Sequence, residues 1–253
     1  MADLPTPAPA NRFSRTRLRW EIVLVLCVTF GQSAVYSLIT LLRRFLATVP
    51  LSQQSTQLNP QRDTVPVWDV IYNVLDVFFD LALVALVVYL LWEPGRNALR
   101  AIGLDFRRIG SDTVRGVVLV LAIGIPGIGL YLVGRSLGFT VAVQTSATDL
   151  TWWTVPTLLL SALRSGLMEE IVMIGWLFDR FRRIGVGPWA TIVTSAVVRG
   201  LYHSYQGVGP IIGNFVMGLV FGWAYRRWGR VMPLVIAHTL IDAVAFRPRL
   251  TPA

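Results

Sequence analysis

Seven long apolar runs dominate this chain of 253 residues and constrain its fold more than any other feature. Hydrophobic residues make up 54% of the sequence and charged residues only 15%, whereas a soluble domain carries about 25% charged residues. A helix needs roughly 20 apolar residues to cross a bilayer, and each run approaches that length, although the last three are short. The runs span residues 20–42, 70–92, 113–134, 154–178, 188–204, 208–225 and 231–246. They predict an all-α polytopic membrane protein.

The distribution of arginine supports seven spans. Arginines cluster before residue 20 and in the segments 93–112, 179–187 and 226–230, which share one side of the membrane if there are seven spans. The positive-inside rule then predicts a cytoplasmic N-terminus. The segment 43–69 is an exception, because it carries three arginines on the other side. A short re-entrant or interfacial segment hidden there would raise the count to eight.

The domain organisation follows from these runs. Residues 1–18 are rich in proline, alanine and arginine, which predicts a disordered cytoplasmic tail. Residues 19–150 are expected to form N-terminal transmembrane helices, and residues 151–247 a helical core with a polar cavity. The net charge of +9 is explained by topogenic arginines, so nucleic acid is not an expected partner. The single cysteine, Cys27, excludes an internal disulfide.

Ionisable residues interrupt the apolar runs of the C-terminal part. Glu169 and Glu170 lie halfway along the fourth run, and the two histidines of the chain, His203 and His238, lie in later runs. Asp242 follows His238 by four residues, so both project from the same helical face. Ionisable groups inside a membrane are costly and are functional candidates by default. The alternative interpretation is that they form ion pairs that only hold helices together.

Two further runs carry supporting candidates. Arg199 precedes His203 by four residues on one face and needs a counter-charge, for which Glu170 or Glu169 is the candidate. Asn214, in the sixth run, is expected either to line the cavity or to hydrogen-bond to a neighbouring helix. Gly218 and Gly222, in the same run, form a GxxxG pattern that indicates close helix packing.

This set of residues is sufficient for hydrolysis. A carboxylate and an imidazole can together deprotonate a water, and the second histidine with its partner can stabilise the oxyanion. Glu169, His203 and His238 could instead hold one zinc ion with an open coordination position. The sequence leaves both schemes open, although it contains no HExxH motif.

The order of these residues resembles the CPBP (CAAX protease and bacteriocin-processing, or Abi) family of bacterial membrane proteases. The family motifs EExxxR, FxxxH and HxxxN (or HxxxB, where B is asparagine or aspartate) correspond to residues 169–174, 199–203 and 238–242. The resemblance implies that Glu169 and His203 activate water and that His238 and Asp242 form the oxyanion hole. It covers about residues 154–246.

Three positions depart from the family pattern. Ile174 replaces the arginine of the first motif, and Arg199 replaces the phenylalanine of the second. Our hypothesis is that the positive charge has moved to the fifth run and still neutralises a glutamate. Asp242 replaces asparagine, and an ionised aspartate cannot donate a hydrogen bond to an oxyanion. Asp242 is therefore protonated, orients His238, or serves a metal site.

The sequence thus favours an intramembrane endopeptidase, of metallo- or glutamate type, in a bacterial plasma membrane. Its expected partners are the lipid bilayer and a peptide or a lipidated, including prenylated, protein substrate. The alternatives are a non-catalytic membrane scaffold or immunity protein on the same fold, and a transporter or proton relay. No inverted repeat is visible that would favour the transporter.

Overall fold

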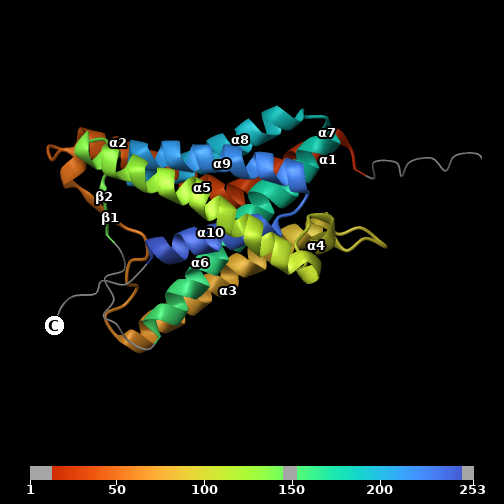
Figure 1. The fold of residues 1–253 in the computed structure, drawn as a ribbon, viewed down its shortest axis with the longest axis horizontal. Coiled ribbons are helices and arrows are strands. Elements are labelled where there is room, and N and C mark those ends of the chain that lie inside the picture. Colours follow the sequence, from red (N-terminus) through yellow and green to blue (C-terminus); the bar gives the residue numbers. More distant parts are fainter. Residues whose placement is uncertain (1–12, 145–152, 247–253) are drawn as a thin grey trace, which may run out of the picture.

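The computed structural model describes residues 13–144 and 153–246, and these form a bundle of long helices (Figure 1). The first rod, Arg15–Leu46, consists of α1 (Arg15–Leu26), a π-helical turn (Cys27–Gly31) and α2 (Gln32–Leu46). It is followed by α3 (Pro66–Leu91), a short α4 (Ala98–Ala101) and α5 (Ile109–Ser136). The all-α class expected for this chain is confirmed.

The C-terminal part begins with a rod of three segments, α6 (Thr154–Glu170), the π-helical turn η4 (Ile171–Trp176) and α7 (Leu177–Ile184). It continues with α8 (Pro188–Tyr202), α9 (Val208–Trp228) and α10 (Met232–Ala245). Prolines in the first turns of α3, α8 and α10 are compatible with a helix start. Gly185 and Gly229 adopt the left-handed conformation that ends α7 and α9.

Four helices within the described ranges are long and apolar enough to cross a membrane, namely Arg15–Leu46, Pro66–Leu91, Phe106–Ser136 and Val208–Trp228, and Met232–Ala245 is a shorter apolar helix. No more than 33% of each apolar window is buried inside the protein. The apolar side chains that remain face outward, as expected of helices surrounded by lipid.

Each of the seven predicted runs corresponds to one helical rod, but the ends of the rods differ from the prediction. The first helix begins at Arg15, inside the expected tail, because the Ser14 hydroxyl accepts a hydrogen bond from the Arg17 backbone amide at 3.2 Å and caps it. Residues 1–12 of that tail lie outside the described residues.

The segment 43–69 contains no additional long helix within the described residues. A 3₁₀ turn (Leu51–Gln53) is followed by a short strand, β1 (Ser55–Gln57), which pairs in parallel with β2 (Ala142–Gln144). This two-stranded pairing was not predicted, because three-residue strands leave no recognisable period in a sequence.

The rod α6–η4–α7 is the centre of the bundle. Every residue of η4 is buried, and α3 and α10 pack against α6. Close packing also joins α8 to α9, because a Cβ atom on Gly218 would lie 2.7 Å from the Ala196 Cα atom. The GxxxG pattern therefore marks a close helix contact, as predicted.

Candidate active site

The glutamate pair lies where the central rod changes its winding. Glu169 and Glu170 are the last two residues of α6, and the wider η4 turn begins at the next residue. Single π-helical turns inside α-helices are frequent at functional sites. Glu170 is fully buried and Glu169 is 8% exposed. Both carboxylates therefore require partners inside the protein.

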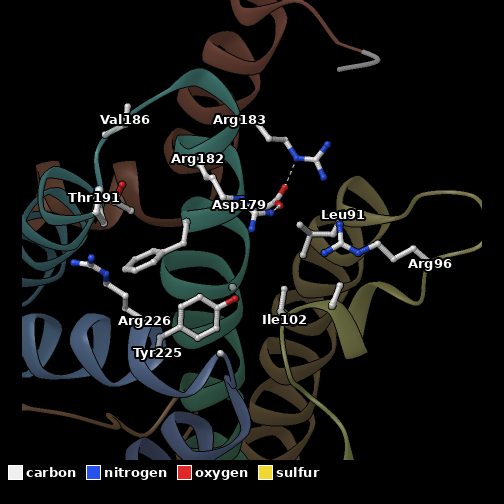
Figure 2. A pocket seen from close by; sticks show the side chains of 15 residues that line it. Leu91, Arg96, Ile102, Asp179, Arg182, Arg183, Val186, Thr191, Tyr225 and Arg226 are labelled. Atoms are coloured by element: carbon white, nitrogen blue, oxygen red, sulfur yellow. Dashed lines mark hydrogen bonds and ion pairs between the residues drawn. The ribbon is translucent and has the colours of Figure 1, made fainter. Parts of the chain in front are cut away.

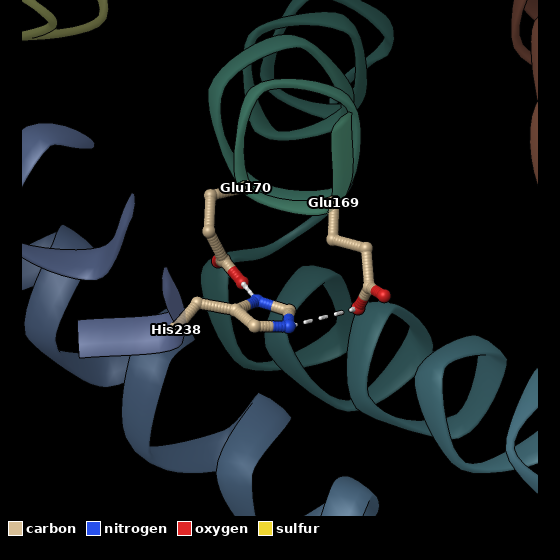
Figure 3. A group of neighbouring side chains, drawn as sticks. All are labelled: Glu169, Glu170 and His238. Carbon is tan, nitrogen blue, oxygen red and sulfur yellow. Dashed lines mark hydrogen bonds and ion pairs between the residues drawn. The ribbon is translucent and has the colours of Figure 1, made fainter. Parts of the chain in front are cut away.

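His238 of α10 lies between the two carboxylates (Figure 3). Its Nδ1 atom is 2.7 Å from Glu170 Oε1, and its Nε2 atom is 3.9 Å from Glu169 Oε2. The helices approach closely here, since a Cβ atom on Gly166 of α6 would lie 2.7 Å from Thr239 Oγ1. Two adjacent glutamates on different faces thus reach opposite sides of a single imidazole.

Arg199 of α8 contacts both glutamates that the sequence offered as its counter-charge. Its Nη2 atom donates to Glu170 Oε1 at 2.7 Å, and its Nη1 atom is 3.4 Å from Glu169 Oε2. The side chain is fully buried and lies over the Phe221 ring, 5.6 Å from the centroid. The hypothesis that the positive charge has moved to the fifth run agrees with this geometry. Ile174, at the position of the missing arginine, is buried in the core.

Tyr202 is a member of the cluster that the sequence reading missed. Its hydroxyl donates a 2.6 Å hydrogen bond to Glu169 Oε2. Its ring stacks on Phe30 with a centroid distance of 4.7 Å, and its carbonyl accepts a 2.9 Å hydrogen bond from Ser37 Oγ. The first rod therefore braces the site. The one available signal was the position of Tyr202 directly before His203, and a tyrosine at a helix end is more often an interface residue.

His203 caps the C-terminal end of α8 and faces the same carboxylate. Its Nε2 atom is 3.8 Å from Glu169 Oε1, too long for a direct hydrogen bond. This nitrogen is buried and has no hydrogen-bond partner among the residues that the structure describes. Its Nδ1 atom lies 3.4 Å from Gln206 Nε2. The geometry leaves Nε2 available for a group held between His203 and Glu169.

Asp242 completes the set one helical turn after His238. Its Oδ2 atom is 3.6 Å from His238 Nε2. The side chains of Asp242 and His203 are each 20% exposed, whereas those of Glu170 and Arg199 are buried completely. The cluster therefore has a closed side, at the Arg199–Glu170 pair, and a more open side at His203 and Asp242.

Two polar residues of these runs have partners elsewhere. Asn214 donates a 3.0 Å hydrogen bond to the Pro210 carbonyl one turn earlier in α9, and not to a neighbouring helix as one expectation had it. Arg164 pairs with Asp80 of α3 at 3.4 Å. Within the described part of the chain, the structure thus brings together the four expected catalytic residues, Glu170 and Arg199, whereas the hydrogen bond of the Asn214 amide goes to its own helix.

The proposed zinc site was tested against this geometry. Glu169, Glu170 and His238 offer ligand atoms within 4.8 Å of one another, and this group of described residues includes Glu170 in place of the expected His203. However, Arg199 contacts both carboxylates, and Glu170 Oε1 also bonds to His238 Nδ1. A divalent cation would be repelled by the guanidinium and would compete for atoms that are already paired. These three residues could hold a metal ion, but an ion bound there would have to displace the contacts that Glu170 makes with Arg199 and His238.

The comparisons with known proteins agree with the sequence motifs. Residues 151–244 match the family model described as Rce1-like: Type II CAAX prenyl endopeptidase Rce1-like. The match contains the whole cluster, and it confirms the resemblance to the CPBP family for this part of the chain. Comparison with curated proteins and with solved structures gave no match.

Proposed function

We propose that this chain is an intramembrane endopeptidase that hydrolyses a peptide bond of a membrane-associated substrate. One observation carries the proposal. Glu169 Oε1 lies 3.8 Å from His203 Nε2, a buried nitrogen that has no hydrogen-bond partner among the described residues. Both atoms lie on the more open side of the cluster. The family match to CAAX prenyl endopeptidases supports the same reaction class.

In this scheme, Glu169 and His203 activate water. The two atoms are 3.8 Å apart, so a water oxygen that bridges them would lie within hydrogen-bond reach of both side chains. Glu169 accepts a proton while the water oxygen attacks the scissile carbonyl carbon, and His203 orients the water. The proton is then delivered to the leaving amine nitrogen as the peptide bond breaks.

His238 stabilises the oxyanion in the same scheme. Its Nδ1–H donates to Glu170 Oε1, which fixes the ring orientation. A proton on Nε2 can then be donated to the tetrahedral oxyanion. Asp242 orients the ring from 3.6 Å and balances the imidazolium charge, and it does not itself donate. This role removes the difficulty raised by aspartate at the position of the family asparagine.

Arg199, Glu170 and Tyr202 are positioning residues in this account. Arg199 neutralises part of the carboxylate charge, and Tyr202 holds Glu169 Oε2 so that Oε1 faces His203. A buried carboxylate that lacks such partners is strongly destabilising. The residues 151–247 would then form the catalytic core, with residues 19–150 bracing it.

A lipidated, including prenylated, protein is the proposed substrate class, and a bacterial plasma membrane with a cytoplasmic N-terminus is the proposed setting. The family description supports the prenyl group. The arginine-rich segments support the orientation. In Figure 1 the helix α4, the helix α7 and the first residues of α1 lie at the same end of the bundle.

The test is cleavage of membrane-anchored peptides, with and without a prenyl group, by purified protein in detergent. The products are identified by mass spectrometry, and the metal content of the same sample is measured. We expect cleavage that His203→Ala abolishes, without stoichiometric zinc. Absence of cleavage by folded protein would favour the non-catalytic scaffold, and stoichiometric zinc that is required for cleavage would contradict the water-activation scheme.

A further inference from the structure

A cavity of about 500 Å³ lies at the arginine-rich end of the bundle (Figure 2). It is bounded by the last turn of α3, by α7, and by the C-terminal end of α9. Its volume falls within the range of small-ligand sites. None of the proposed catalytic residues lines it. The cavity is therefore a separate feature of the molecule.

The cavity carries an excess of positive charge. Four arginines line it, Arg96, Arg182, Arg183 and Arg226. Two carboxylates oppose them: Asp179 pairs with Arg182 and Arg183, and Glu93 pairs with Arg183 and Arg96. Arg180 also contacts Asp179, but its charge is matched by Glu21 at 2.6 Å. Four positive charges against two negative charges leave an excess of two.

Arg226 is the arginine best placed to receive a ligand. It has no carboxylate partner within the described ranges, and its guanidinium lies 5.8 Å from the centroid of the Trp189 ring. Figure 2 shows Arg226 and Tyr225 extending from α9 on the side of the cavity opposite Arg96. A planar guanidinium is suited to bidentate recognition of a phosphate group.

The position and lining of the cavity suit the headgroup of a lipid. Three helices end here, α3 at Leu91, α7 at Ile184 and α9 at Trp228. Leu91 and Ile102 make part of the wall apolar, and Trp189, whose ring lies below the Arg226 guanidinium, is 60% exposed. A phospholipid could thus place its phosphate group among the arginines while its acyl chains lie along the outward apolar faces of the helices. Basic pockets between membrane helices favour anionic headgroups.

We propose that this cavity binds the phosphate group of an anionic phospholipid. The proposal goes beyond the protease assignment and does not depend on it, since it is tested by lipid binding and not by cleavage. Free inorganic phosphate shares the same chemistry, and the experiment separates the two sources.

The chain provides a matched control for the test. Arg226 and Arg227 are adjacent, both exposed and at the same end of α9, but only Arg226 lines the cavity. The full chain in detergent is titrated with fluorescent phosphatidylglycerol and, separately, with fluorescent phosphatidylcholine. We expect Arg226→Ala to weaken phosphatidylglycerol binding about fivefold, as for the loss of one arginine near a membrane surface, and Arg227→Ala to change it less than about twofold.

Arg96→Ala is a second test from the opposite wall and should also weaken phosphatidylglycerol binding. Equal weakening by Arg226→Ala and Arg227→Ala would overturn the proposal, because it would indicate a diffuse surface charge. Equal affinity for the two lipids would overturn it as well. Complete displacement of the lipid by millimolar inorganic phosphate would assign the cavity to free phosphate instead. Thermal unfolding of each variant verifies that it is folded.

Discussion

At the scale of residues, one carboxylate joins the parts of the site. Glu169 accepts a 2.6 Å hydrogen bond from the Tyr202 hydroxyl. Its carboxylate oxygens lie 3.8 Å from His203 Nε2 and 3.9 Å from His238 Nε2. Arg199 completes its surroundings at 3.4 Å. A carboxylate with this set of neighbours is held in one orientation before any substrate arrives, which suits the role of general base proposed for it.

Tyr202→Phe is expected to lower kcat about tenfold with little change in KM. The substitution removes a hydrogen bond to a charged group, worth about 1.5 kcal/mol, and keeps the stacking on Phe30. Steady-state cleavage kinetics measure the effect. Tyr131→Phe is the matched control, since its hydroxyl bonds to the Val143 amide away from the cluster. Equal kinetics for the two variants would show that Tyr202 does not position Glu169.

The pair Arg199–Glu170 is expected to behave as one coupled unit. Arg199→Ala leaves a buried carboxylate without its nearest cation and should lower the free energy of unfolding by about 3–5 kcal/mol. The double variant with Glu170→Gln should lose at least about 1 kcal/mol less than the sum of the single losses. Denaturant unfolding in detergent provides these values. Strict additivity would mean that the two charges do not compensate each other.

Most of the site could be predicted at this scale, because ionisable residues are rare in apolar runs. Glu169, His203, His238 and Asp242 were found in this way, and so was the need of Arg199 for a glutamate. Tyr202 and the actual partner of Asn214 could not be predicted. Their roles depend on which neighbouring helix each side chain meets, and the sequence of a single helix does not contain that information.

At the scale of elements, glycines set how closely the helices pack. Gly218→Ala is expected to lower the free energy of unfolding by about 1–3 kcal/mol, because the new Cβ atom would lie 2.7 Å from the Ala196 Cα atom and must separate α8 from α9. Gly213→Ala in the same helix is the control. Its Cβ atom would meet Leu130 Cδ2 at 3.5 Å, an ordinary contact, so thermal unfolding should change little. Similar losses for both would contradict the packing argument.

The seven helical rods could be predicted because apolar length is a strong signal. The π-helical turn after Glu170 and the short strands β1 and β2 could not. A π-helical turn differs from an α-helix by one residue in its hydrogen bonding, and composition does not record that difference. This turn follows the paired glutamates directly, so a local feature of the backbone beside the site could not be predicted from the sequence.

At the scale of the whole molecule, one ionic contact ties the hairpin between α9 and α10 to the first turn of α5 and to the segment before it. Arg230 donates to both Asp112 oxygens, at distances between 2.6 and 2.9 Å, and to Asp105 Oδ1 at 3.1 Å. Gly103, with φ of 71°, allows the chain to pass against Arg230. The contact holds the end of α10, and hence His238, relative to the first half of the bundle.

Arg230→Ala is expected to lower the free energy of unfolding by about 3 kcal/mol, because Asp112 stays fully buried without its cation. Arg227→Ala, an exposed neighbour, should change it by less than about 0.5 kcal/mol. The hydrogen bond from Arg230 lowers the pKa of Asp105 below its ordinary value of 3.8. The contribution of Asp105 to stability is therefore present above that value and is lost as the pH falls below about 4.

This acid sensitivity should be smaller in Arg230→Ala than in the unmodified chain, as measured by unfolding at several pH values. An identical pH profile for the two proteins would indicate that Arg230 does not stabilise the ionised form of Asp105.

The most direct test of the central claim is peptide cleavage by Glu169→Gln, with Asp80→Asn as a second membrane carboxylate exchanged in the same isosteric way. Asp80 pairs with Arg164 outside the cluster. The account predicts that Glu169→Gln is folded and has lost detectable cleavage, while Asp80→Asn cleaves at close to the original rate. Cleavage by folded Glu169→Gln at the original rate would contradict the assignment of Glu169 as the base and, with it, the proposed active site.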